Sequence, residues 1–77
     1  MDPEPAPYII RIKGRLGTTV LAAFPELAPQ HHRAYTVLTG LLDQSALFGV
    51  LAEIEALGLE LLEIRKLTPA VHRGVPQ

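Results

Sequence analysis

The chain contains no cysteine among its 77 residues, which excludes disulfide bonds and zinc sites built on thiolates. The formal net charge is only -1, so no overall attraction to nucleic acid or anionic lipid is expected. No apolar run approaches the ~18 residues of a membrane-spanning helix. The acidic, proline-rich start MDPEPAP does not resemble a signal peptide. These absences predict a cytoplasmic protein without a membrane partner.

Hydrophobic residues are abundant for so short a chain, at 48% of the sequence with a mean hydropathy of +0.23. A single domain of this size buries only about 60% of the surface that its unfolded chain exposes. Part of the aliphatic surface is therefore expected to meet another chain. We expect a homodimer, with a further protein partner as a possibility.

The second half of the sequence predicts one capped helix, a glycine stop and a strand. Asp43 is suited to cap the helix, because its carboxylate can accept a backbone N–H near the positive end of the helix dipole. Gly58 is expected to end the helix at positive φ. The apolar stripe of the helix consists of Leu47, Val50, Leu51, Ile54 and Leu57. Residues 61–67 then alternate, with Leu62 and Ile64 on the core side of a half-buried strand.

Four weaker elements precede this unit. They are a strand over residues 8–16, a short helix over 18–24, an edge strand over 27–32 and a strand over 35–42. Thr18 or Thr19 is the expected cap of the short helix, and Pro29 restricts its strand to an edge position. Gly40 indicates a bulge or a close backbone approach. The predicted domain covers residues 8–68, between flexible tails at 1–7 and 69–77.

The order of these elements, βαββαβ, predicts an α+β protein of the ferredoxin-like type, with an antiparallel sheet and both helices on one face. Right-handed crossovers place the first and third strands in the centre. The other face of the sheet is then uncovered. The residues expected on this face, and proposed as the interface, are Ile9, Arg11, Lys13, Leu61, Glu63, Arg65 and Leu67.

The segments YIIRIKGRL, TVLTG and DQSALFGVLAEIEALGLELLEIRKL resemble a set of short bacterial proteins, mostly of unknown function. Those proteins pair a strand ending in Thr-Gly with a helix that starts at Asp-Gln, and a Leu-Gly-Leu turn leads into their last strand. The resemblance covers residues 8–67 and implies the same fold. It implies no activity and no functional residues.

Polar clusters give little support to catalysis or metal binding. His31 and His32 are adjacent, so on an extended segment they point to opposite sides, and no third ligand is suitably spaced. Glu53 and Glu55 lie about 200° apart around a helix, which favours a solvated face over paired catalytic carboxylates. No catalytic residue, cofactor or metal ligand is assigned from the sequence.

Two further patterns suggest binding of phosphate or RNA. Gly14 and Gly17 precede the short helix as Gly-Arg-Leu-Gly, which matches neither nucleotide-binding fingerprint and favours a structural turn over anion binding. A basic group of Arg11, Lys13, Arg15 and Arg65 would gather on the sheet. An RNA-recognition sheet also needs stacking rings on its central strands, and few are available. Nucleic acid is therefore the less favoured partner.

Three functions fit these observations. The leading hypothesis is a non-catalytic interaction module, homodimeric, that binds a partner protein or a small ligand. The first alternative is an enzyme similar to the dimeric α+β barrel monooxygenases and isomerases, with an enclosed cavity between sheet and helices. Its candidate polar groups are Tyr35, Thr39, His31 and His32. The second alternative is a domain that senses a small molecule at a subunit interface near residues 14–18.

Overall fold

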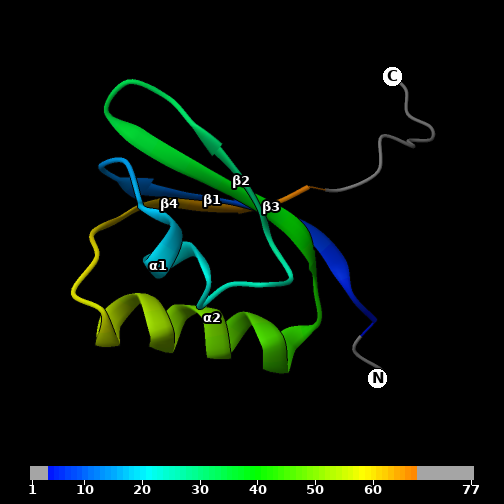
Figure 1. Cartoon of the computed structure of the whole chain (residues 1–77). Coiled ribbons are helices and arrows are strands. Elements are labelled where there is room, and N and C mark those ends of the chain that lie inside the picture. The colour runs from blue at the N-terminus through cyan, green and yellow to red at the C-terminus, as the bar shows by residue number, and fades with distance from the viewer. Residues whose placement is uncertain (1–3, 68–77) are drawn as a thin grey trace, which may run out of the picture.

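The computed structural model describes residues 4–67, which form a four-stranded antiparallel sheet with both helices on one face (Figure 1). The elements are β1 (Ala6–Lys13), α1 (Thr18–Leu21), β2 (Ala28–His31), β3 (Tyr35–Leu42), α2 (Gln44–Ala56) and β4 (Leu61–Lys66). The strand order β2-β3-β1-β4 puts β1 and β3 in the centre, which confirms the α+β prediction. The tail predicted over residues 69–77 lies outside the described residues.

β1 is the central strand of the core. Ile10 and Ile12 are fully buried beneath the helices, as expected for alternate residues of a half-buried strand. The strand starts at Ala6, earlier than predicted, because Ala6 and Pro7 pair with the end of β3. It stops at Lys13 instead of continuing to residue 16, because Gly14 adopts a φ of 92° and turns the chain.

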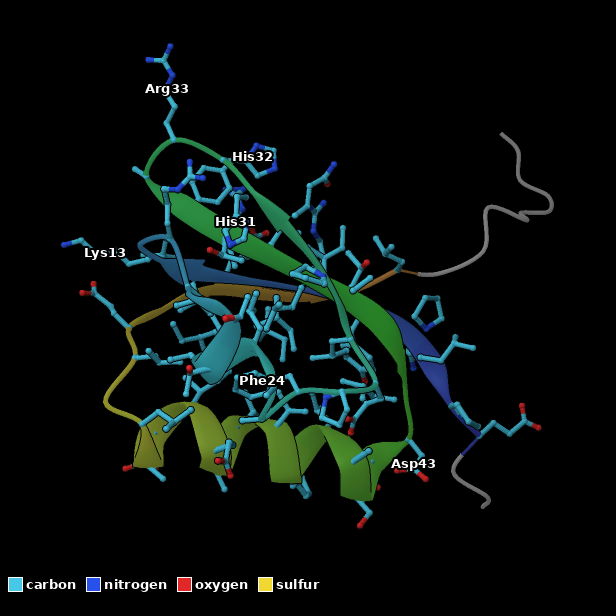
Figure 2. The ribbon with its side chains drawn as sticks, in the orientation of Figure 1. Lys13, Phe24, His31, His32, Arg33 and Asp43 are labelled. Atoms are coloured by element: carbon cyan, nitrogen blue, oxygen red, sulfur yellow. The ribbon has the colours of Figure 1, made fainter. Side chains whose placement is uncertain are left out.

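The segment after β1 fills the core mainly with turns. α1 is a single helical turn, shorter than the predicted helix, and Phe24 and Leu27 follow it into the core. Figure 2 shows Phe24 between the sheet and α2. The prediction of a threonine cap is wrong, since Gly17 is the N-cap residue and no side chain bonds to the helix start. Pro25 lies directly after Phe24 and prevents a longer helix.

The start of α2 follows the sequence prediction closely. Oδ1 of Asp43 accepts a hydrogen bond from Ala46 N at 2.7 Å, so the predicted cap is confirmed. Val50 and Ile54 are the buried positions of the helix. Leu47 and Leu51 pack at the margins of the same core. This stripe holds α2 against the sheet.

The end of α2 differs from the prediction in one residue. Leu57 is the C-cap residue and is 41% exposed, so its assignment to the buried stripe is wrong. Gly58 has the expected positive φ of 71°. Leu59 N donates to Ile54 O at 3.0 Å, and Leu59 packs against the core. This is the Schellman arrangement, in which the second residue after the cap supplies the apolar contact.

β4 does not keep the strict alternation that the sequence suggested. Ile64 pairs with Ile10 and Glu63 pairs with Arg11, but a bulge follows, and Leu61 pairs with Ile12. Leu62 is 47% exposed, so its assignment to the core is wrong. The extra residue shifts the phase of the strand by one position, which places Leu61 opposite a core residue.

No helix within residues 4–67 is both long and apolar enough to cross a membrane.

Candidate functional site: the open face of the sheet

The open face is the side of the sheet away from α1 and α2 (Figure 1). Because Ile10 and Ile12 point toward the helices, the alternate residues of β1 and their cross-strand partners point the other way. The open face consists of Pro7, Ile9, Arg11 and Lys13 from β1, Ala28 and Gln30 from β2, Tyr35, Val37, Thr39 and Leu41 from β3, Glu63 and Arg65 from β4, and Leu67.

Three charged residues of β1 and β4 form a cluster on the open face, which we call the charged cluster: Arg11, Glu63 and Arg65. Arg11 and Glu63 pair directly across β1 and β4, with 2.9 Å between Nη2 of Arg11 and Oε1 of Glu63. Nε of Arg65 lies 3.4 Å from the other carboxylate oxygen, Oε2 of Glu63. The Arg11 and Glu63 side chains are 37% and 34% exposed. One carboxylate therefore holds two arginines in place at the water boundary.

Aromatic rings extend this charged cluster toward the β2–β3 turn. The guanidinium carbon of Arg11 lies 5.2 Å from the ring centroid of Tyr35, within cation–π distance. Tyr35 stacks on His32, with ring centroids 4.7 Å apart and the planes inclined by 15°. The side chains on this half of the face therefore support one another, which lowers their conformational freedom before any partner arrives.

The other half of the open face is apolar. Leu41 pairs with Pro7 across β3 and β1, and Pro7 O accepts a hydrogen bond from Leu67 N at 2.8 Å. These three residues thus lie in one row, with Ile9 and Thr39 in the next. Leu41 is 65% exposed and Leu67 37% exposed. We name this group the apolar corner; it consists of Pro7, Ile9, Leu41 and Leu67.

Most of the residues predicted for the interface do meet on this face. Ile9, Arg11 and Lys13 line β1, and Glu63, Arg65 and Leu67 lie beside them. Leu61 is separated from this group by the bulge. The contribution of β3 was missed, above all Leu41. Its uniform run YTVLTGLL contains no charge that would mark one side of the strand as facing water.

The glycine-containing turn after β1 is held by a buried threonine. Thr36 Oγ1 donates to Gly14 O at 2.8 Å and accepts from Leu16 N at 3.1 Å. Nε2 of His31 lies 2.8 Å from Leu16 O. Leu16 N, the backbone donor that could have bound an anion, is therefore already bonded to Thr36. This favours a structural role for the turn over an anion site.

The histidines and tyrosine considered for catalysis do not converge. His31 bonds to Leu16 O, whereas His32 stacks on Tyr35, and the two histidines point to different sides of the hairpin (Figure 2). Tyr35 and Thr39 lie on the open face, away from the helices. Among residues 4–67, no three His, Asp or Glu side chains are placed to hold a metal ion.

A pocket of about 520 Å³ lies where β1 starts and α2 begins. It is lined by Glu4, Ala6, Tyr8, Leu42, Gln44, Leu47, Phe48 and Lys66. Between the sheet and the helices, the space is occupied by buried side chains such as Phe24, Ile10 and Leu38. The pocket is therefore at the end of the layers, which differs from the enclosed cavity expected of a barrel-type enzyme.

Comparison with known proteins gives a family but no activity. Residues 7–65 match the model of a domain of unknown function, DUF8691. The chain belongs to this family. No curated protein and no solved structure matches it. The match covers both helices and all four strands except Ala6 and Lys66 at their ends, so the open face lies within the family unit apart from Leu67.

Proposed function

We propose that this DUF8691 domain is a small, non-catalytic interaction module that works as a homodimer. The second copy covers the open face. The antiparallel order β2-β3-β1-β4 and the two helices on one side support a ferredoxin-like arrangement, in which one sheet face is left without helices.

The exposed apolar corner is the observation that carries this proposal. Leu41 is the most exposed large apolar residue among those described, at 65%. It lies beside Pro7 and Leu67, and Ile9 follows in the next row. Clustered apolar surface favours burial by roughly 25 cal/mol per Å². A second copy can cover this corner with the same corner of its own, as a two-fold axis requires.

The charged cluster fits the margin of such a contact. Arg11, Glu63 and Arg65 carry both signs and already form ion pairs within one chain. They can therefore stay hydrated at the rim, and burial would not leave a carboxylate or guanidinium without a partner. An apolar centre with a polar rim is the usual composition of a specific protein interface.

Substitution of Leu41 by glutamate tests the proposal. A charge in the apolar corner would be buried without a partner in the face-to-face contact, so Leu41→Glu should break this contact and halve the mass measured by size-exclusion chromatography with light scattering. Ile9→Glu should also weaken the dimer. Its effect should be smaller, because Ile9 pairs with Arg65, which would partly compensate the new carboxylate.

Phe48→Glu is the matched control, because Phe48 is 59% exposed and lies on α2, on the other side of the sheet. It should keep the mass of the wild type. A wild type that stays monomeric at about 100 µM, far above the concentrations at which specific dimers usually form, would rule out the proposal.

Binding of a small ligand is the second candidate, and the end pocket supports it. Its volume of about 520 Å³ lies within the roughly 300–1,000 Å³ of ligand sites. Lys66 offers a cation and Phe48 an aromatic wall. A panel of aromatic carboxylates should then contain compounds that raise the Tm of the wild type and not that of Lys66→Met. Equal shifts for both proteins would exclude this site.

A further inference from the structure

The two edges of the sheet differ in what they offer to another strand. β2 forms one edge and is only four residues long. The hydrogen bond from His32 N to Tyr35 O shows that the backbone of His32 faces β3. Because backbone direction alternates along the strand, the N–H and C=O groups of Pro29 and His31, where present, point away from β3. Because proline has no N–H, it cannot donate to an added strand. The β2 edge is therefore protected against pairing.

The β4 edge has a bulge and charged side chains but no proline, so its outward N–H groups can donate to an added strand. Leu67 N donates to Pro7 O at 2.8 Å, so the backbone of Leu67 faces β1. In an antiparallel pair the backbone groups of successive residues point alternately toward and away from the partner strand. Ile64 and Lys66 therefore turn their N–H and C=O groups away from β1. In the part of the chain that the structure describes, no strand lies beyond β4. β4 contains no proline, and Leu62 is 47% exposed at its start.

We propose that β4 pairs with β4 of a second copy of this chain, antiparallel, about a two-fold axis that passes beside Ile64. The N–H of each Ile64 then donates a hydrogen bond to the C=O of Ile64 in the other copy. The two sheets become one continuous antiparallel sheet. This contact uses the edge of the sheet, and it does not depend on the proposed contact through the open face.

Charge selects this register among those centred on residues 63–66. A two-fold axis perpendicular to the sheet keeps each residue on its own face, so only residues of the same side can pair. Pairing centred on Ile64 puts Glu63 of each copy opposite Arg65 of the other. Registers centred on Glu63, Arg65 or Lys66 put like charges directly opposite, which is unfavourable.

The same geometry joins the two proposed contacts. Because the axis is perpendicular to the sheet, the helices of both copies lie on one side and the two open faces form one larger surface on the other. If that surface also pairs with its own copy, as the proposed function requires, the two axes are perpendicular, and the assembly closes as a tetramer where they intersect.

A charge-swap experiment tests the edge contact separately. Leu41→Glu serves as the background, since it removes the face contact and lies on β3, away from β4. In this background the chain should be a dimer. In the proposed register, position 63 of each copy faces position 65 of the other. Adding Arg65→Glu therefore puts two carboxylates opposite each other, and adding Glu63→Arg instead puts two guanidinium groups opposite each other. Each should raise the dissociation constant at least about tenfold.

An equal mixture of these two proteins should form a heterodimer, because every Glu again faces an Arg across the new pairing. Arg33→Glu is the matched control. It changes the charge by the same amount as Arg65→Glu but lies in the β2–β3 turn and points away from the sheet (Figure 2), so the dimer should persist. Circular dichroism verifies that each variant is folded.

Native mass spectrometry and sedimentation velocity measure the outcome. Recovery of dimer on mixing supports the edge pairing, since the two variant chains do not carry net charges of opposite sign and net charge alone would not draw them together. A monomeric Leu41→Glu protein overturns the edge proposal while supporting the face contact. If Leu41→Glu leaves the mass of the wild-type dimer unchanged and adding Arg65→Glu does not weaken that dimer, both the face contact and the edge contact are overturned.

Discussion

Gly40 of β3 lies directly against Leu27. A Cβ atom at Gly40 would be 2.7 Å from Cδ2 of Leu27 and 2.8 Å from the carbonyl oxygen of Glu26. Leu27 is 6% exposed and belongs to the core. The segment that leads into β2 can therefore cross β3 this closely only because position 40 has no side chain. The expectation of a close backbone approach at Gly40 is confirmed.

Gly40→Ala should consequently destabilise the protein by about 1–3 kcal/mol, since a rigid backbone carbonyl would have to move. Gly49→Ala is the matched comparison. Gly49 lies within α2, and a Cβ there meets nothing within 4 Å. Alanine is preferred to glycine inside a helix by about 1 kcal/mol, so this change should stabilise. Urea unfolding of both variants measures the two free energies. The same sign for both would contradict the packing described around Gly40.

Thr36→Val tests the clamp on the turn after β1. Thr36 is fully buried, and its hydroxyl is the partner of both Gly14 O and Leu16 N. Valine keeps the shape but leaves these backbone groups without that partner, at a cost of about 1–3 kcal/mol. Thr39→Val, on the open face of the same strand, should change the free energy of unfolding by less than about 0.5 kcal/mol. Equal effects would show that the clamp does not stabilise the fold.

Much of the sheet–helix frame could be predicted from local signals. Asp43 and Gly58 mark the two ends of α2 by capping chemistry, which depends on the chain within one turn. The alternation of Ile10 and Ile12 indicates the buried face of β1. The bulge in β4 could not be predicted, because it depends on how residues 61 and 62 meet Ile12 on another strand.

The open face could be predicted only in part, for a similar reason. The charges at Arg11 and Glu63 mark a water-facing side on β1 and β4. β3 gives no such mark, since its apolar residues are on both faces. Leu41 was therefore found only from its pairing with Pro7. The cation–π contact between Arg11 and Tyr35 joins two strands far apart in sequence and has no local signal.

The corrected position of Leu57 gives a further test of α2. Ile54 is 3% exposed, so Ile54→Ala should leave a cavity and cost about 2–5 kcal/mol. Leu57 is 41% exposed at the C-cap, and Leu57→Ala should cost less than about 1 kcal/mol. Glu53→Ala should also cost little, since Glu53 is exposed. Denaturant melts compare the three variants. A larger loss for Leu57 than for Ile54 would mean that the helix is rotated relative to the sheet.

The central claim, that a second copy covers the open face, can be tested most directly on the unaltered chain. Hydroxyl-radical footprinting at about 1 µM and about 100 µM compares side-chain oxidation below and above the concentration range of typical specific dimers. The account predicts that Leu41 and Ile9 become protected at the higher concentration, as the mass rises, while the equally apolar Phe48 keeps its oxidation rate. Leu41 oxidised at the same rate at both concentrations, or protection of Phe48 instead, would contradict it.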